Sequence, residues 1–243
     1  MTDAHAHIGT QAELSVRQAH HIRTILCGTE PASAAAVLQI ASQNPLFTPC
    51  CALHPWQAAA HNPESMLPYL EKCPIVGETG LDSVWCETPL HQQMDALLWT
   101  LDYAEKVKKP VVLHTKGMER EIAHILRPYS IPKVIHWYSC DVPPDDYLDQ
   151  DCFFTIGPDA EKNPAVRRVI ASAPLDRLLV ETDGMEAVSW AMGRHVPPEG
   201  LPDALRACMR AIAAQRRLTL GEVEALADRN FDALIHLAPS AYA

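Results

Sequence analysis

Two kinds of segment alternate along the chain, and this alternation constrains the fold more than any other feature of the sequence. Short runs rich in β-branched and aromatic residues recur eight times. Between them, apolar residues recur every three or four positions, which is typical of amphipathic helices. The runs that we expect to form strands cover residues 2–8, 23–29, 46–55, 74–82, 109–115, 132–139, 152–158 and 176–184.

Eight strands that alternate with helices in 243 residues predict an α/β fold, namely a (β/α)8 barrel of the TIM type. A doubly wound open sheet is the alternative for such an alternation. The sequence contains no low-complexity tract, linker or convincing internal repeat. We therefore expect residues 1–243 to form a single domain.

Composition limits the classes of function. No run of about 18 apolar residues is present, and the first residues lack the pattern of a signal peptide. The eight cysteines are scattered without a CxxC pair, which is typical of reduced thiols. The net charge of −10 argues against a surface that coats nucleic acid, but it is compatible with an enzyme that holds a strand end. We expect a cytoplasmic protein that binds no membrane and needs no obligate protein partner.

Titratable residues occur where most of the predicted strands end. In a barrel, the carboxyl ends of the strands surround the active site. His5 and His7 lie two residues apart and therefore point to the same face of the first strand. The other residues at strand ends are His54, Glu78, His114, His136, Glu181 and Asp183.

Glu78 follows the apolar pair Ile75-Val76, where a buried carboxylate is costly unless it is paired or bound to a metal. One histidine at a strand end is more often a hydrogen-bonded loop residue than a ligand, and one buried acid can pair with an arginine. Several such residues at one barrel end instead favour a metal site, and this donor set suits zinc, manganese or iron better than calcium. The expected ligands are His5, His7, Glu78, His114, His136 and Asp183. Six ligands exceed the needs of one tetrahedral ion, so we expect two divalent ions (zinc, manganese or magnesium) with Glu78 between them.

Six motifs in order carry a resemblance to a known family. They are DAHAH (3–7), LHPW (53–56), VGETGLD (76–82), PVVLHT (110–115), VIHWYS (134–139) and VETDG (180–184). In these motifs the chain resembles the TatD family of metal-dependent hydrolases, within the amidohydrolase superfamily. The resemblance implies that His5, His7, Glu78 and Asp183 hold one ion, and that Glu78, His114 and His136 hold the other. It also implies hydrolysis of phosphodiester bonds in DNA, typically from a strand end.

The chain departs from the family pattern outside these ligands. Ser83 follows GLD where the family usually has tyrosine, Lys116 stands near the usual arginine after the fifth strand, and Gly184-Met185 replaces the expected proline segment. The chemistry is therefore better supported than the identity of the substrate.

The expected reaction follows from the metal site. A bridging hydroxide is a nucleophile at neutral pH, because a metal lowers the pKa of bound water from ~15.7 to about 7 in favourable sites. We expect Asp183 to act as general base beside the catalytic carboxylate Glu78, and Glu181 to orient a ligand. Lys116 and His54 are candidates for phosphate contacts, and His54 is also a candidate donor to the leaving group. Trp56 and the other tryptophans after strand ends could stack on bases or simply cover the barrel end.

Two alternatives are left open. The same site could cleave a small ester or amide or an aminoacyl-tRNA, with a small molecule in place of a DNA or oligonucleotide end. A metal-binding barrel could also act without catalysis, as a partner or scaffold.

Overall fold

The computed structural model of the protein, which describes residues 1–239, is a barrel of eight parallel strands. Neighbouring strands pair in sequence order from β1 to β8, and a bridge between Ala6 and Asp183 brings the last strand segment back to the first. The strands are β1 (Thr2–His7), β2 (Arg23–Gly28), β3 (Phe47–Cys51), β4 (Ile75–Gly80), β5 (Val111–His114), β6 (Lys133–Ile135), β7 (Phe153–Ile156) and β8 (Leu178–Val180). The predicted (β/α)8 barrel is confirmed, and the alternative of an open sheet is wrong because β8 returns to β1.

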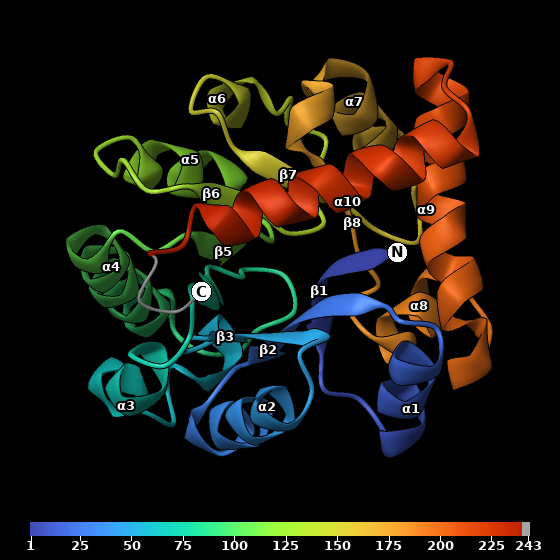
Figure 1. Ribbon diagram of the computed structural model, residues 1–243. Coiled ribbons are helices and arrows are strands. Elements are labelled where there is room, and N and C mark those ends of the chain that lie inside the picture. The colour runs from blue at the N-terminus through green and yellow to red at the C-terminus, as the bar shows by residue number, and fades with distance from the viewer. Residues whose placement is uncertain (240–243) are drawn as a thin grey trace.

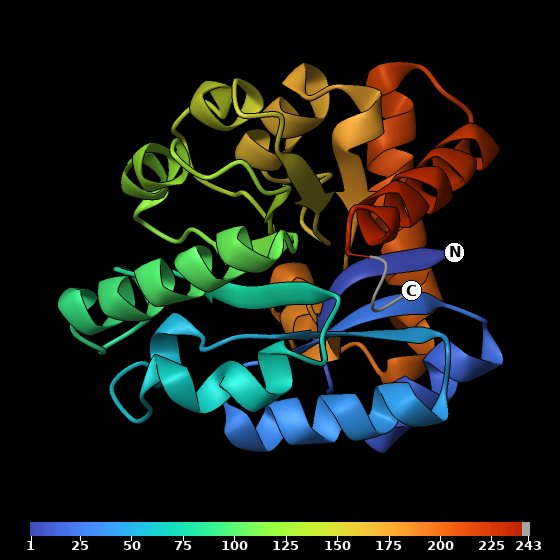
Figure 2. The ribbon, with the colours of Figure 1, turned by 60° about the vertical axis from the view of Figure 1, so that its left-hand side comes forward.

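Helices lie outside the ring of strands (Figure 1, Figure 2). They are α1 (Gln11–Ala19), α2 (Pro31–Gln43), α3 (Leu67–Leu70), α4 (Leu90–Val107), α5 (Glu119–Leu126), α6 (Asp145–Leu148), α7 (Pro164–Ser172), α8 (Met185–Met192), α9 (Leu201–Arg216) and α10 (Leu220–His236). Short 3₁₀ turns cover Pro55–Gln57, Pro63–Met66, Leu175–Arg177 and Pro198–Gly200. Thr219 and Glu222 form a capping box at the start of α10. No helix within residues 1–239 is long and apolar enough to cross a membrane.

Several strands are shorter than predicted at their carboxyl ends. β3 ends at Cys51, so His54 lies in the loop that leads into the 3₁₀ turn at Pro55. β6 and β8 end at Ile135 and Val180. Beyond these points the backbone N–H groups of His136 and Glu181 still donate to Leu113 and Ile156 of the neighbouring strands. Their side chains face each other, and His136 also faces Glu78, across the barrel mouth.

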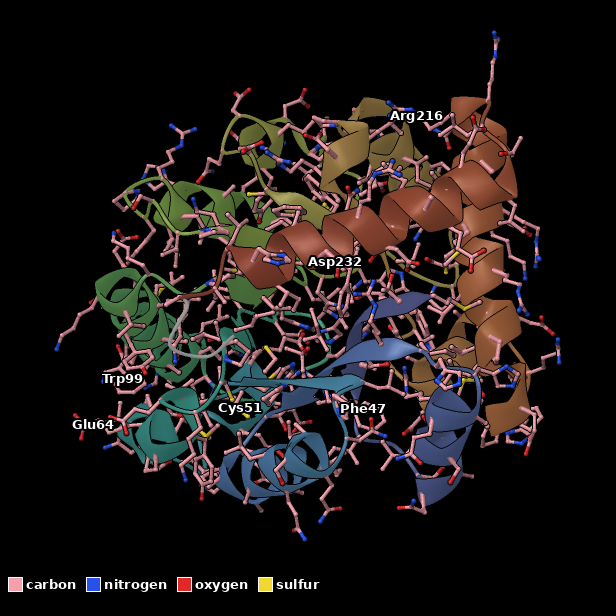
Figure 3. The ribbon with its side chains drawn as sticks, viewed as in Figure 1. Phe47, Cys51, Glu64, Trp99, Arg216 and Asp232 are labelled. Atoms are coloured by element: carbon pink, nitrogen blue, oxygen red, sulfur yellow. The ribbon has the colours of Figure 1, made fainter. Side chains whose placement is uncertain are left out.

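The interior of the barrel is closed at the amino ends of the strands. Phe231 and Leu234 of α10 belong to the same buried cluster as the inward side chains of the strands, such as Ile25 and Val112. Figure 1 shows α10 crossing in front of the strands. Asp232 of α10 (labelled in Figure 3) pairs with Arg23 at the start of β2. Because α10 covers this end, the opposite end is the open mouth of the barrel.

Candidate metal centre

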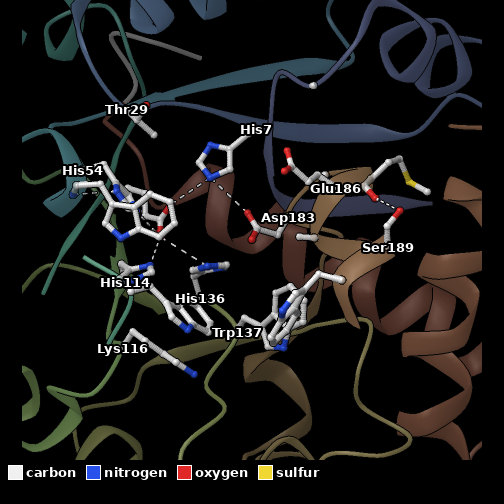
Figure 4. A pocket seen from close by; sticks show the side chains of 18 of the residues that line it. His7, Thr29, His54, His114, Lys116, His136, Trp137, Asp183, Glu186 and Ser189 are labelled. Atoms are coloured by element: carbon white, nitrogen blue, oxygen red, sulfur yellow. Dashed lines mark hydrogen bonds and ion pairs between the residues drawn. The ribbon is translucent and has the colours of Figure 1, made fainter. Parts of the chain in front are cut away.

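The six residues expected to bind metal lie together at the carboxyl ends of the strands, beside a cavity of about 1120 Å³ (Figure 4). β1 carries His5 and His7, β4 carries Glu78, and β5 ends at His114. His136 and Asp183 lie in the loops after β6 and β8.

Glycines allow β4 to bring Glu78 to this place. A Cβ atom on Gly80 would lie 1.9 Å from the carbonyl oxygen of His114, and one on Gly77 would lie 2.8 Å from the Cβ of Val112. Only glycine fits where two backbones approach this closely. The two glycines of the segment therefore set the register that places Glu78 beside His114.

Four side chains form a first group around one point. The Nε2 atom of His5 lies 3.4 Å from both Glu78 Oε2 and Asp183 Oδ1. The Nε2 atom of His7 lies 3.5 Å and 3.3 Å from the same two oxygens. Ligands about 2.1 Å from a common ion, at tetrahedral angles, are separated by about 3.4 Å. The spacing of these atoms therefore fits one ion at their centre.

Atoms without hydrogen-bond partners also support a metal ion at the centre of this group. His5 Nε2, Glu78 Oε2 and Asp183 Oδ1 are buried and have no hydrogen-bond partner. Unpaired buried polar atoms are rare in proteins because leaving them so costs free energy. A divalent cation at the centre of the group would satisfy all three atoms, so the residues present fit a metal ion.

A second group surrounds the other oxygen of Glu78. The Oε1 atom lies 2.8 Å from His114 Nδ1, 3.6 Å from His136 Nε2 and 3.5 Å from His54 Nε2. Each carboxylate oxygen of Glu78 thus faces its own set of imidazoles. This geometry suits a carboxylate that lies between two ions.

The outer nitrogens of the ligand candidates have partners of their own. His136 Nδ1 lies 2.9 Å from Glu181 Oε2, and His114 Nε2 lies 3.1 Å from Asp82 Oδ2. A carboxylate at the outer nitrogen holds the proton there and leaves the inner nitrogen free to bind a metal. His5 Nδ1 lies 3.2 Å from the buried thiol of Cys27.

His54 differs from these histidines. The backbone N–H of Trp56 donates to His54 Nδ1 at 3.2 Å. A backbone N–H can only donate, so the proton of neutral His54 is on Nε2, which faces Glu78. Burial lowers the pKa of His54, which favours this neutral form. In this tautomer His54 donates a hydrogen bond toward Glu78, while its ring nitrogen also lies in a group with Glu78 and His114 that is compact enough to hold an ion. The contact to phosphate or to the leaving group that we expect from the sequence stays a prediction.

Asp82 is a residue of the centre that the sequence analysis missed. Its Oδ2 atom contacts His114 and accepts from Trp56 Nε1 at 2.8 Å, while Oδ1 accepts from the backbone of Val84 and Trp85 at 2.8 Å each. Burial alone would raise the pKa of Asp82, but these hydrogen bonds, led by that from His114, hold it well below its usual value. Asp82 thus joins a ligand candidate to two tryptophans at the mouth. The motif GLD contained this residue, but no local pattern shows its partners.

Glu13 is a second residue that was missed. It completes the capping box of α1 with Thr10, and its Oε2 atom accepts from the backbone N–H of Met185 at 3.1 Å. Asp183, at φ 60°, and Gly184, at φ 97°, precede that N–H. Glu13 therefore holds the loop that presents Asp183 to the centre.

The charges of the centre are strongly coupled. Burial alone would raise the pKa of Glu78, but the imidazoles around it, led by His136 and His54, hold it well below its usual value. Burial opposes protonation of His114, yet its hydrogen bonds with Asp82 and Glu78 raise its pKa to about 9. In the same way, the nearby imidazoles, led by that of His5, overcome burial and lower the pKa of Asp183 to about 2. The carboxylates are thus ionised at neutral pH and able to bind cations.

The candidates for substrate contact line the cavity. The Nζ atom of Lys116 lies 4.2 Å from the ring centre of Trp85 and 3.5 Å from Ser139 Oγ. Trp56 is half exposed, at 49%, and its Nε1 is held by Asp82. Trp137, also expected at the mouth, donates through Nε1 to Asp159 at 2.7 Å.

Comparison with known proteins places these features in a family. A family model described as TatD related DNase matches residues 2–236. The chain is 26% identical over 212 residues to an "Uncharacterized metal-dependent hydrolase TatD" of Mycobacterium tuberculosis, covering 75% of this chain and 79% of that protein. It is 28% identical over 188 residues to a protein of Erwinia tasmaniensis named "3'-5' ssDNA/RNA exonuclease TatD", covering 72% and 71%.

Solved structures show the same fold. The TatD homologue YJJV of Escherichia coli superposes with a TM-score of 0.83 at 24% identity, covering 96% of this chain and 97% of that one. A TatD family hydrolase of Entamoeba histolytica superposes with a TM-score of 0.72 at 12% identity, with the same coverage of 96% and 97%.

Proposed function

Because the chain belongs to the TatD family of metal-dependent hydrolases, we propose that it is a deoxyribonuclease that removes nucleotides from strand ends at a two-metal centre. The observation that supports this most strongly is the group of four donor atoms 3.3–3.5 Å apart, three of which are buried without a hydrogen-bond partner. The relative named as an exonuclease supports the choice of substrate.

In this proposal the two oxygens of Glu78 serve different ions. His5, His7, Glu78 and Asp183 would hold one divalent ion, and Glu78, His114 and His136 would hold the other. When bound, the ions would activate a water molecule and neutralise charge that develops on the phosphoryl group. They would also make the mouth of an acidic protein locally positive, which favours an anionic substrate.

The protein's own side chains would handle protons and orientation. Asp183 keeps a carboxylate at the mouth, where its side chain is 20% exposed, and it would accept the proton of the attacking water. His54 carries its proton on Nε2 and would donate to the phosphate or the leaving oxygen. Glu181 would keep His136 in the tautomer that binds metal.

Substrate contacts in the proposal come from the cavity wall. Lys116 would pair with a phosphate, and Trp56 would stack on a base, a contact worth ~1–3 kcal/mol. Trp56 is suited to this role because the hydrogen bond to Asp82 fixes its ring beside the centre.

The test is product analysis on single-stranded DNA labelled at either the 5' or the 3' end, with Mg²⁺, Mn²⁺ or Zn²⁺ added to purified protein. The proposal predicts stepwise release of nucleotides from one end, lost on addition of a chelator and in Glu78→Gln. A panel of esters, lactones and aminoacyl-tRNA serves as the comparison. Turnover of that panel without cleavage of any oligonucleotide would favour the small-substrate alternative and refute the nuclease.

A further inference from the structure

We propose that this site is built for short single strands, because the protein holds only the last few nucleotides and gains nothing from a longer chain. The inference rests on the proposed nuclease function and adds the length of the substrate to it. Three properties of the cavity carry it: its size, its charge and the arrangement of its aromatic wall.

The size of the cavity limits how much of a strand it can hold. A volume of about 1120 Å³ corresponds to a linear dimension of about 10 Å. At the roughly 3.4 Å rise per nucleotide of a stacked strand, this spans at most about three nucleotides. The remainder of a longer strand would lie outside the cavity.

The charge of the cavity wall is unsuited to gripping a polyanion. Among the described residues that line the cavity, Lys116 is the only lysine or arginine. Five carboxylates line it as well, Glu13, Glu78, Glu119, Asp183 and Glu186. The first ion-binding group would use two of them, which leaves three that repel phosphates beyond the scissile one.

The other carboxylates are fixed in place by the fold. Glu13 accepts from Met185, and Glu119 accepts from the backbone N–H of Gly117 at 3.0 Å. Glu186 is exposed on the first turn of α8. Glu13 and Glu119 are buried, so a strand that continued outward would meet the carboxylate of Glu186 directly and the other two only through their charge.

Aromatic rings form the remaining wall. Trp190 makes edge-to-face contacts with Trp85 at 5.7 Å and with Trp137 at 6.1 Å between ring centres. Trp85 and Trp190 are half exposed or more, at 51% and 64%. The ammonium of Lys116 lies against Trp85, so the single cation and the rings belong to one surface. Stacking on a terminal base therefore contributes more here than contacts with the backbone of the strand.

The first experiment measures kcat/KM per strand end for single strands of two, three, five, ten and twenty nucleotides. We expect it to reach its maximum by about three nucleotides and then to stay level within about twofold. With one side-chain contact to phosphate, kcat/KM should fall about threefold between about 50 and 200 mM salt. A tenfold rise between three and twenty nucleotides, or a salt effect of about fiftyfold as expected for four contacts, would overturn the inference.

Comparing Lys116→Ala with a control lysine variant shows which side chain contacts the phosphate. Lys116→Ala should abolish most of the salt dependence on strands of every length. Lys162 is exposed in the loop after β7, at the same end of the barrel, and does not line the cavity. Lys162→Ala should leave both the salt dependence and the length profile unchanged. A loss that is confined to the longest strand in Lys162→Ala would show that strands are held outside the cavity, against the inference.

The outcomes distinguish failure of the inference about strand length from failure of the proposed nuclease function. Cleavage that favours long strands would refute the claim that only the last few nucleotides are held, and would leave the nuclease function standing. Failure to cleave at any length would refute the nuclease function and the inference with it.

Discussion

At the scale of single residues, hydrogen-bond partners distinguish histidines whose inner nitrogen is free to bind metal from one whose inner nitrogen carries the proton of the neutral ring. His114 and His136 each have a carboxylate at the outer nitrogen, whereas His54 receives a backbone N–H there. Histidines at the same end of the barrel are therefore suited to two different roles, metal binding and hydrogen-bond donation.

Asp82 provides a prediction at this scale. Asp82→Asn removes the charge and replaces one acceptor oxygen with a donor. With the amide nitrogen in place of Oδ2, His114 and Trp56 both lose their partner; with it in place of Oδ1, the backbone N–H groups of Val84 and Trp85 lose theirs. We expect affinity for one ion to fall about 10–100-fold, measured by calorimetry, together with a change in tryptophan fluorescence. Asp159→Asn is the control, because Asp159 holds Trp137 and is not among the groups around Glu78. Unchanged metal affinity in Asp82→Asn would show that Asp82 does not orient His114.

The pH dependence of metal binding gives a second prediction. The pKa of His114 is raised to about 9 in the metal-free protein, so its imidazole is protonated at neutral pH and a cation must displace that proton. Metal affinity should therefore rise with pH up to about 9 and level off above it. Calorimetry at pH 7 in two buffers of different ionisation enthalpy should detect proton release, and equal heats in both buffers would contradict this account.

The convergence of the six histidine and acidic residues could be predicted from sequence because each one lies in, or shortly after, a recognisable strand. Asp82 and Glu13 could not be identified in the same way. Glu13 contacts Met185, 172 positions away in sequence, and no periodicity connects the two. Functional partners of this kind depend on loop geometry, which strand and helix patterns do not determine.

At the scale of secondary-structure elements, a buried ion pair joins the first and last strand segments. The carboxylate of Asp3 in β1 lies 2.6 Å from Arg17 of α1, and both side chains are fully buried. Asp3 also accepts from the backbone N–H of Thr182 after β8 at 2.9 Å, while Arg17 donates to the hydroxyl of Thr182 at 3.1 Å. The place where the barrel closes is thus fixed immediately beside the metal centre.

This contact can be tested by removing one partner. Arg17→Met leaves Asp3 as an unpaired buried charge, so the free energy of unfolding should fall by about 3–5 kcal/mol. The double variant Asp3→Asn with Arg17→Met should recover part of this loss, since the amide oxygen can still accept from Thr182. Urea denaturation measures both. A double variant that is less stable than Arg17→Met would show that charge pairing is not the reason for the loss.

The strands themselves were predictable in number and order, but not in length. The runs of β-forming residues continued to positions 55, 139 and 184, whereas β3, β6 and β8 end at Cys51, Ile135 and Val180. Beyond these points the backbone turns so that side chains such as His136 face Glu78 and Glu181. At these positions, contacts between side chains that are distant in sequence override the local preference for a β-strand. A pattern in a single sequence does not reveal such contacts.

At the scale of the whole molecule, one end of the barrel is closed by α10, and the other carries buried ring and carboxylate atoms without a hydrogen-bond partner, such as His5 Nε2 and Glu78 Oε2. Ions that bind only the folded state would stabilise it by RT ln(1 + [L]/Kd), about 2.7 kcal/mol at a hundredfold excess over Kd. We expect thermal unfolding of metal-loaded protein to occur at a higher temperature than after chelation. Lys116→Ala should show the same shift as wild type, and Glu78→Gln a smaller one. An equal shift in Glu78→Gln would argue against a role for this residue in metal binding.

The most direct test of the central claim is the metal content of the purified, metal-loaded chain, measured by mass spectrometry beside Glu78→Gln. A carboxylate that lies between two ions predicts two ions per wild-type chain and one or fewer in Glu78→Gln, because the amide removes the charge that both ions share. One ion per chain in the wild type, or the same number in both proteins, would contradict the two-metal centre.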